Sequence, residues 1–322
     1  MARPTPGRRR QRVCGASLVA GHDSPANPAA AHGSGPKATP LFHEGKLFTL
    51  GISGIVTAFD AANGEIRWRT PEPAEVPFFS AASSPVGVGH LVIVHPGNYG
   101  PLTAFDTDSG TVQWTAGDDG FFMSPTVATL GGIQQVISVT QKAVMGVSVP
   151  GGRVLWEYPW TGGGTGGTMP VLSGETVIAS ASGTGTIAIQ PVRQGDQWVV
   201  KTRWETREVS VYLSNPVVVD DTLFGLSERA SGQFFALDAR DGKVLWLGSP
   251  RETANSAVAK AGNVLFLLND DAELIVARAS RTGLVPLRRY MVADSPTWAQ
   301  PAISGNRFFI KDASTLALWT LD

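Results

Sequence analysis

The sequence predicts an all-β fold, a β-propeller built from four-stranded blades. The first observation is a phrase in which an Asp stands eight residues, and a Gly four residues, before a Trp. It occurs at 57–68 (TAFDAANGEIRW), 103–114 (TAFDTDSGTVQW) and 235–246 (FALDARDGKVLW). The second is a Pro that opens an apolar run in phase with this phrase. A period of about 40 residues in a sequence rich in short apolar runs is typical of propeller blades.

The two series together define seven repeats. The tryptophans of the first are 46, 42, 48 and 42 residues apart: Trp68, Trp114, Trp156, Trp204 and Trp246. The prolines of the second are Pro40, Pro85, Pro125, Pro170, Pro216 and Pro301, and the last gap spans two periods. The sixth unit has no such proline. Ala257 stands at its position, and the apolar pattern continues there. The units therefore begin near residues 38, 83, 123, 168, 214, 256 and 299.

Each repeat contains signals for four strands. The Pro opens the first strand, where a missing N–H does least harm. A turn such as Glu44-Gly45 or Ala261-Gly262 leads to a second apolar strand. A third strand ends at the Asp of the phrase, whose side chain can bond nearby backbone N–H groups, while the Gly accepts a positive φ. The last strand carries the Trp.

The phrase resembles the tryptophan-docking motif of the pyrroloquinoline quinone (PQQ) β-propeller superfamily, over roughly residues 34–322. The nearest subgroup is similar to the non-catalytic members related to the outer-membrane assembly lipoprotein. The resemblance implies that each Trp stacks against a neighbouring blade, and that the ring commonly has eight blades. The matching positions are Asp60, Gly64, Trp68, Asp106, Gly110, Trp114, Gly152, Trp156, Asp238, Gly242 and Trp246.

Some repeats depart from the motif. Unit three has Ser148 at the Asp position, and unit six has Leu287 where we expect the Trp. In unit four Trp198 follows Gly195 one residue too soon, and Trp204 is the candidate that keeps the period. Unit seven stops after its third strand. Propellers avoid an exposed sheet edge by pairing strands from the two termini, so we expect the missing strand from the N-terminus, or an eight-bladed ring with a truncated first blade.

Composition narrows the possible functions. The chain has 322 residues, 37 Gly, 22 Pro and only 16% charged residues, as expected for one propeller domain with many turns. The net charge of −1 argues against nucleic-acid binding, which needs a basic face. We expect no transmembrane segment, because no apolar run is long enough. We also expect a monomer.

A single cysteine, Cys14, excludes an intrachain disulfide and a Cys-x-x-Cys-His haem site. The resemblance implies that catalytic quinoprotein dehydrogenases carry two adjacent, disulfide-bonded cysteines over the quinone, and this chain cannot form such a pair. Residues 1–33 form a second segment, which we interpret as a disordered or misassigned N-terminal tail. It contains no clear signal peptide, although the resemblance implies a periplasmic or envelope location.

The candidate binding residues lie where the chain passes from one blade to the next. Such loops line the mouth of the central channel in propellers. Trp298 stands outside the docking series, just before the innermost strand of unit seven, and Tyr212 holds the same relative place before unit five. With their neighbours they form the predicted polar and aromatic mouth: Tyr212, Asn215, Asp294, Trp298 and Gln300.

Other polar clusters are better explained by structure. His90 and His95 flank one strand and, five residues apart, should point to opposite faces. The stretch 269–273 (NDDAE) lacks the rest of a calcium loop and is interpreted as a solvated turn. The glycine run at 162–167 lacks the Lys-Ser/Thr ending of a phosphate loop and is interpreted as an inter-blade connection. We therefore expect no catalytic residues and no metal site.

Three function classes remain open. The first is a non-enzymatic propeller of the bacterial envelope that presents loops to a protein partner or a small ligand, with no cofactor. The second is a PQQ-dependent oxidoreductase, an alcohol or sugar dehydrogenase that would need PQQ and calcium. The third is a hydrolase or lyase that uses an acid at the mouth such as Asp294, for which no motif is present. The first is favoured.

Overall fold

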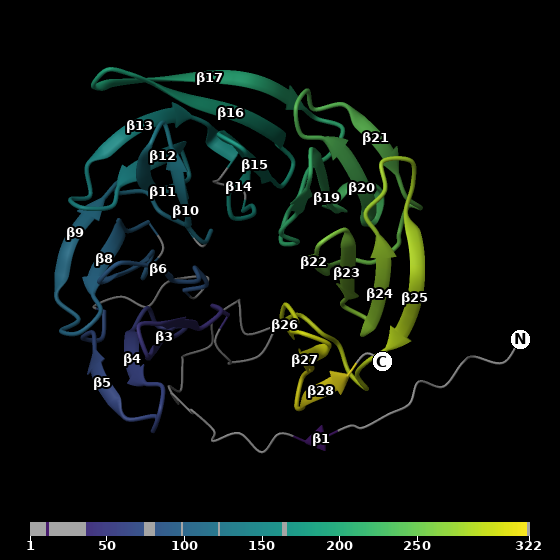
Figure 1. The fold of residues 1–322 in the computed structure, drawn as a ribbon, viewed down its shortest axis with the longest axis horizontal. Helices are drawn as coiled ribbons and strands as arrows, with labels where there is room; N and C mark the ends of the chain where they lie inside the picture. Colours follow the sequence, from purple (N-terminus) through teal and green to yellow (C-terminus); the bar gives the residue numbers. More distant parts are fainter. Residues whose placement is uncertain are drawn as a thin grey trace, which may run out of the picture. The chain divides into compact units, whose positions relative to one another are not determined.

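The computed structural model describes residues 11–12, 37–73, 81–97, 99–121, 123–162 and 166–320. These residues form seven four-stranded antiparallel sheets, so the fold is the predicted β-propeller of four-stranded blades (Figure 1). The sheets, called blades 1 to 7 in chain order, agree with the seven predicted repeats. The chain divides into two compact units, which are described separately.

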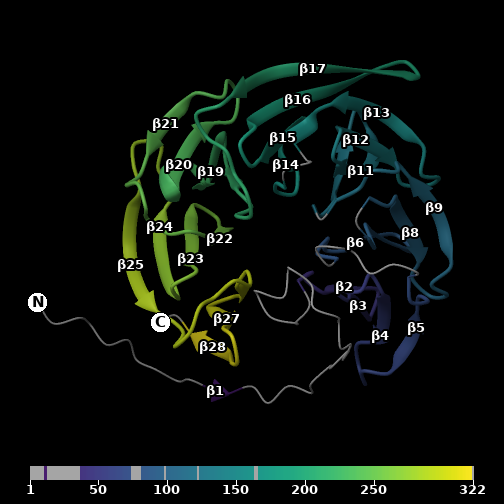
Figure 2. The same ribbon diagram turned by 180° about the vertical axis from the view of Figure 1, so that it is seen from behind.

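One unit contains blades 1 to 4, whose strands are arranged in chain order from the first to the fourth (Figure 2). Blade 1 has β2 (Leu41–His43), β3 (Lys46–Leu50), β4 (Val56–Asp60) and β5 (Ile66–Arg69), and blade 2 has β6 (Val86–Val88), β7 (Leu91–Val94), β8 (Leu102–Asp106) and β9 (Val112–Ala116). Blade 3 has β10 (Thr126–Leu130), β11 (Ile133–Val139), β12 (Ala143–Ser148) and β13 (Val154–Pro159), and blade 4 has β14 (Val171–Ser173), β15 (Thr176–Ala181), β16 (Gly185–Gln194) and β17 (Gln197–Thr206).

The other unit contains blades 5 to 7. Blade 5 has β18 (Val217–Val219), β19 (Thr222–Ser227), β20 (Gln233–Asp238) and β21 (Val244–Leu247), with the 3-10 helix η3 (Arg229–Ser231) in one turn. Blade 6 has β22 (Ser256–Ala261), β23 (Val264–Asn269), β24 (Glu273–Arg278) and β25 (Val285–Met291), and blade 7 has β26 (Ala302–Ser304), β27 (Arg307–Lys311) and β28 (Leu316–Thr320).

The fourth strand of blade 7 comes from the N-terminal part of the chain. The strand β1 (Gln11–Arg12) pairs antiparallel with β28, with Gln11 opposite Leu318. The expectation that the N-terminus supplies the missing strand is therefore confirmed, and blade 7 is not left with three strands. An additional truncated blade and a disordered tail over residues 1–33 stay predictions, because nearly all of that segment lies outside the described residues.

The docking tryptophans share one position in the sheet. Each lies opposite a small residue of the third strand, immediately before a β-bulge in five of the blades. The pairs are Ala58 with Trp68, Ala104 with Trp114, Gly146 with Trp156, Ala188 with Trp204, and Ala236 with Trp246. A small opposing side chain leaves room for the indole to lean toward the next blade. Trp204, and not Trp198, is thus the docking residue of blade 4.

The docking contact itself joins neighbouring blades through a glycine. A Cβ atom on Gly110 would lie 2.6 Å from the ring of Trp68, and one on Gly152 would lie 2.8 Å from the ring of Trp114. Both glycines also have a positive φ, of 71° and 68°, which disfavours any residue with a side chain. The indole ring therefore lies directly on the backbone of the next blade's last turn.

A hydrogen bond completes the same contact. The indole N–H of Trp68 donates to the carbonyl oxygen of Thr107 at 3.0 Å, and that of Trp114 donates to Val149 at 2.8 Å. In the second unit Trp246 donates to Ser280 at 2.8 Å. In each case the acceptor precedes a glycine by three residues: Gly110, Gly152 and Gly283. Blade 6 therefore has a docking turn although its sequence lacks the Asp of the motif.

Two blades depart from this arrangement for identifiable reasons. The hairpin of β16 and β17 in blade 4 has ten residues in each strand, which carries its tip far beyond the usual turn. Trp156 of blade 3 instead donates to Oε1 of the buried Gln135 in its own blade, at 2.6 Å.

In blade 6 the turn after β24 is longer, and Arg288 lies opposite Val276 at the docking position. The assignment of Leu287 to that position was wrong by one residue.

Blade 6 has no tryptophan at its docking position, and the blade beside it is built differently from the others. The third and fourth strands of blade 7, β28 and β1, are supplied by opposite parts of the chain. No hairpin of the described residues joins these two strands, whereas a hairpin turn receives the indole in blades 2 and 3.

The Asp of the motif caps the turn between the third and fourth strands. Oδ1 of Asp106 accepts the backbone N–H groups of Asp108 and Ser109, at 3.1 and 2.8 Å. These bonds lower the pKa of Asp106. Asp238 is nearly buried, and bonds from Arg240 and then from Arg281 of blade 6 hold its pKa well below the usual range despite the burial. The motif Asp thus fixes its own turn and, in blade 5, also contacts the next blade.

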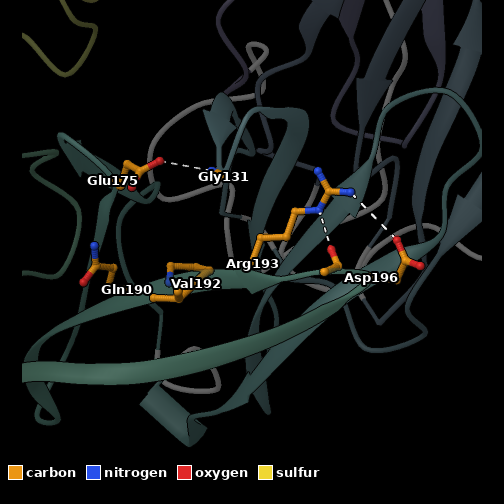
Figure 3. Close-up of a pocket in the computed structure, with 8 residues that line it drawn as sticks. Gly131, Glu175, Gln190, Val192, Arg193 and Asp196 are labelled. Atoms are coloured by element: carbon orange, nitrogen blue, oxygen red, sulfur yellow. Dashed lines mark hydrogen bonds and ion pairs between the residues drawn. The ribbon is translucent and has the colours of Figure 1, made fainter.

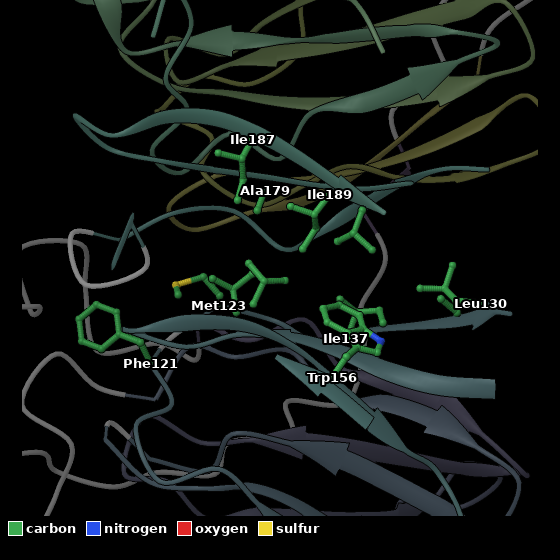
Figure 4. Packing of buried hydrophobic residues seen from close by; sticks show 12 residues of the cluster. Phe121, Met123, Leu130, Ile137, Trp156, Ala179, Ile187 and Ile189 are labelled. Carbon is green, nitrogen blue, oxygen red and sulfur yellow. The ribbon is translucent and has the colours of Figure 1, made fainter. Parts of the chain in front are cut away.

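Apolar side chains between blades form the core. In the unit of blades 1 to 4, Trp156 packs with Ile137 of its own blade and with Ala179, Ile187 and Ile189 of blade 4 (Figure 4). Burial of the docking tryptophans is uneven. Trp114 and Trp156 are 8% and 4% exposed, whereas Trp68 and Trp246 are only half-buried.

We expect the substitution Trp114→Ala to lower the free energy of unfolding by roughly 3–5 kcal/mol, the usual cost of deleting a large buried aromatic side chain. The loss includes the ring contact with Gly152 and the bond to Val149. Urea denaturation followed by tryptophan fluorescence and circular dichroism measures it. Trp298→Ala is the control, because Trp298 is 49% exposed and should cost less than about 1 kcal/mol. Equal midpoints for both variants would contradict the docking role.

Candidate functional site

The inter-blade junctions of the second unit form a rigid surface at one end of its blades. Each junction is hydrogen-bonded to the turn between the second and third strands of a blade. Before blade 5, Oγ of Ser210 donates to Glu228 at 2.9 Å. Before blade 7, Thr297 donates through Oγ1 to the carbonyl of Asn269 at 2.7 Å, and through its N–H to Asp270 at 3.2 Å. These loops are therefore fixed by the sheets below them.

The junction before blade 5 presents two apolar side chains to solvent. Tyr212 and Leu213 are 42% and 47% exposed, while the residues on either side, Val211 and Ser214, are buried. Buried residues on both sides hold the exposed pair in place. The mouth prediction included Tyr212 but missed Leu213. The run of three apolar residues at 211–213 (VYL) was the available signal, since consecutive residues of an extended segment point to opposite faces and cannot all be buried on one side.

The junction before blade 7 presents Trp298, which is 49% exposed although its neighbour Thr297 is buried. Gln300, two residues further on, is exposed but donates through Nε2 to the carbonyl of Val258 in blade 6 at 3.2 Å. Asp294 is exposed in the same junction, and Asn215 is half-buried in the junction before blade 5.

Blade 6 lies between the two junctions and is bonded to both. Oγ of Ser214 donates to Oδ1 of Asn255 at 2.5 Å, and Gln300 reaches Val258 on β22 from the other side. The three exposed side chains Tyr212, Leu213 and Trp298 are called the junction surface from here on. The structure places all five predicted mouth residues in these two junctions, but a single opening that all five line stays a prediction.

The histidine pair has a structural role. His95 is buried, and its Nε2 lies 2.8 Å from Oγ of Ser138 in the next blade, whereas Nδ1 of the exposed His90 lies 3.3 Å from Glu44. The two rings therefore serve different contacts. Burial lowers the pKa of His95 to about 4, so this imidazole is neutral at pH 7. A buried Ser and His without solvent access cannot attack a substrate.

The acidic stretch 269–273 is only partly a solvated turn. Asn269 is 1% exposed, and Oδ1 of the half-buried Asp270 accepts a hydrogen bond from Thr253 at 2.5 Å. Asp271 is exposed, as expected. The correction arises because this turn supports the junction before blade 7 and therefore lies beneath another loop. Residues 163–165 of the glycine run at 162–167 lie outside the described residues, so its role as an inter-blade connection stays a prediction.

An open cleft of about 490 Å³ lies under the long hairpin of blade 4 (Figure 3). Its charged groups already have partners within the chain. Glu175 accepts the N–H of Gly131 at 3.1 Å, Arg193 donates to the carbonyl of Gly195 at 2.9 Å, and the Arg193 to Asp196 pair spans 3.9 Å. The cleft has mixed charge and selects no class of ligand by itself.

Neither a metal cluster nor a membrane helix is found in the described segments. No group of three or more His, Cys, Asp or Glu side chains within them is arranged to hold a metal ion. No helix among the same residues has the length and apolar character needed to cross a membrane.

The comparisons with known proteins agree with this architecture. The family model described as outer membrane protein assembly factor BamB matches residues 12–248, well over half of the chain. The chain belongs to the BamB family. The resemblance to PQQ-like propellers related to the outer-membrane assembly protein is thereby confirmed.

Two BamB proteins illustrate the distance between relatives. The Shewanella oneidensis outer membrane protein assembly factor BamB is 25% identical over 261 residues, covering 73% of this chain and 62% of that protein. Yersinia pestis BamB is 24% identical over 240 residues, covering 71% of this chain and 47% of its own length. The chain thus spans about half to three-fifths of the length of the curated relatives it matches.

Solved structures support the fold. BamB from Moraxella catarrhalis superposes with a TM-score of 0.66 at 17% identity, over 89% of this chain and 83% of that one. The computationally designed Ika8 protein gives 0.57 at 11% identity, over 89% and 98%. At these identities the likeness concerns the fold alone.

The buried His95 should make stability depend on pH. Its pKa is about 4 in the folded protein and near 6.5 when unfolded, so the unfolded state binds the proton first. The free energy of unfolding should therefore fall as the pH drops from 6.5 to 4, by at most about 3 kcal/mol. Urea midpoints across this range test it, with His95→Gln as the control. An equally steep loss in that variant would contradict the assignment.

Proposed function

We propose that this protein is a non-enzymatic scaffold of the bacterial envelope that binds a protein partner during outer-membrane protein assembly. The observation that carries the proposal is the junction surface, in a chain whose curated relatives are named outer membrane protein assembly factors. The proposed location is the periplasmic side of the envelope, and the proposed working state is a monomer bound to its partner.

The physical case rests on the combination of exposure and rigidity. Trp and Tyr side chains are enriched among the residues that dominate the affinity of protein interfaces. A loop that is already ordered loses little conformational entropy on binding. Tyr212 and Trp298 are exposed on junctions whose neighbouring residues Ser214 and Thr297 are bonded to blade 6. Binding through these side chains would therefore gain apolar contact at low entropic cost.

The cofactor-dependent alternative has less support. A quinone dehydrogenase would need a disulfide-forming cysteine pair, or another group that stacks on the quinone, together with a calcium site. The chain has one cysteine, and Trp298 is the only tryptophan of the predicted mouth. We propose that PQQ and calcium have no part in the function.

We expect Tyr212→Ala combined with Trp298→Ala to weaken partner binding at least tenfold, which corresponds to about 1.4 kcal/mol. The partner is the outer-membrane protein assembly machinery purified from the source bacterium, with binding measured by biolayer interferometry. Leu247→Ala is the matched control, since Leu247 is equally exposed at 45% but lies on an outer strand of blade 5. Unchanged melting temperatures would show that folding is intact. Equal affinity of the two variants would refute the assignment of the surface.

Incubation with PQQ and calcium should leave the absorbance spectrum of the quinone unchanged and give no reduction of an artificial electron acceptor with alcohols or sugars. The measurement is dye reduction by the purified protein across a panel of these substrates. Turnover in the range of ordinary enzymes, about 1 per second or faster, would instead favour the oxidoreductase alternative.

A further inference from the structure

Two buried polar side chains face the same space at the junction end of blade 6. Ser256 begins β22, Asn269 ends β23, and the two are directly opposite in the antiparallel pair. They are 2% and 1% exposed. Oγ of Ser256 and Oδ1 of Asn269 each have no hydrogen-bond partner among the described residues. Opposite residues project to the same face, with Cβ atoms about 4.5–5.5 Å apart.

Blade 3 shows how the same position is satisfied within the chain. Asn269 is the fifth residue after Val264, which closes the first turn of blade 6 opposite Ala261, and the fifth residue after the corresponding Ile133 of blade 3 is Ser138. Oγ of Ser138 lies 2.8 Å from Nε2 of His95 in the preceding blade.

The same solution is closed to blade 6. His95 is the fourth residue after Leu91, and the corresponding residue of blade 5, four after Thr222, is Leu226. Leu226 is apolar, 3% exposed, and belongs to the same cluster as Leu267, on the face of β23 that carries Asn269. It therefore offers Asn269 neither a donor nor an acceptor. A buried polar atom without a partner is destabilising, and two such atoms side by side need a common explanation.

The walls of the site are polar, but their bonds are made by other atoms. The N–H of Ser256 donates to Oγ of Ser214 and to Oδ1 of Asn255, both at 3.1 Å. The main-chain carbonyl of Asn269 accepts from Thr297. The site is therefore enclosed by the two junctions that carry Tyr212 and Trp298.

We propose that blade 6 binds one buried water molecule between Ser256 Oγ and Asn269 Oδ1. Buried waters typically make about three hydrogen bonds to polar groups that otherwise lack partners. The occupant must be small, because both residues are at most 2% exposed. It must be able to donate, because the amide oxygen can only accept. A cation is disfavoured because both atoms are neutral, and Oδ1 of the adjacent Asp270 already accepts from Thr253.

Such a water would add to the hydrogen bonds that fix the junctions before blades 5 and 7 to blade 6. It is a structural ligand, and its presence does not depend on the proposed partner or on the location in the envelope.

A crystal structure of the full chain, at a resolution that orders buried waters, tests the proposal directly. The expected result is one density peak within hydrogen-bonding distance of both Ser256 Oγ and Asn269 Oδ1. A second crystal grown with rubidium chloride and measured at the rubidium edge distinguishes an ion. Either an anomalous peak at the site or a site without density in the first crystal would overturn the proposal.

Two variants give an independent readout by thermal unfolding. Asn269→Leu replaces the amide group with two methyl groups in a side chain of the same branched shape. With a bound water, it should lower the melting temperature by several degrees, since Ser256 would lose its partner. Adding Ser256→Ala should recover part of the loss. A rise in melting temperature on Asn269→Leu alone would mean that the site is dry, and the proposal would fail.

Discussion

The stacking of a tryptophan on a glycine of the next blade is the contact on which the rest of the structure depends. A blade buries little apolar surface by itself, and repeat architectures are stable because neighbours pack against one another. Here Trp68 and Trp114 each combine ring contact with a hydrogen bond to the turn of the following blade, and Trp246 makes the corresponding hydrogen bond. The contact limits the distance between blades, because the ring lies on a glycine where a Cβ atom would clash.

The exceptions follow the same physical rule. Blade 7 has no hairpin between its last two strands, and blade 6 has Arg288 at the docking position. Blade 4 has a long outer hairpin, and the indole of Trp156 bonds to Gln135 within blade 3 instead. A tryptophan is thus retained where a partner turn is within reach, and its N–H is satisfied elsewhere in the blade where the turn has moved away.

The docked blades form a rigid scaffold, and the loops that connect them can differ from blade to blade. The junction surface is formed by two such loops. Loops on a rigid scaffold commonly carry recognition. Tyr212, Leu213 and Trp298 are held by buried neighbours that bond to blade 6, so their exposure is a fixed property of the fold and not of a flexible segment. The same hydrogen-bonded junctions enclose the buried pair Ser256 and Asn269.

Most of the fold could be predicted from the sequence because the residues that make the docking contact recur once in each blade. The spacing located Trp204 in blade 4, where the nearer Trp198 was the alternative. Spacing assigned the docking position of blade 6 to Leu287, one residue too early, because the turn before it is longer. Only the strand register shows that Arg288 occupies this position. The burial of Asn269 could not be predicted either, since it depends on a junction loop almost 30 residues later folding over it. Which junction residues share one opening is likewise decided by tertiary packing.

Site-specific photocrosslinking tests the account most directly. A photoreactive phenylalanine analogue placed at position 298 in cells, and in parallel at position 247, should crosslink at 298 to a component of outer-membrane protein assembly identified by mass spectrometry. Position 247 should give no such product, although its side chain is equally exposed. The same product from both positions, or from position 247 alone, would contradict the conclusion that the junction surface binds the partner.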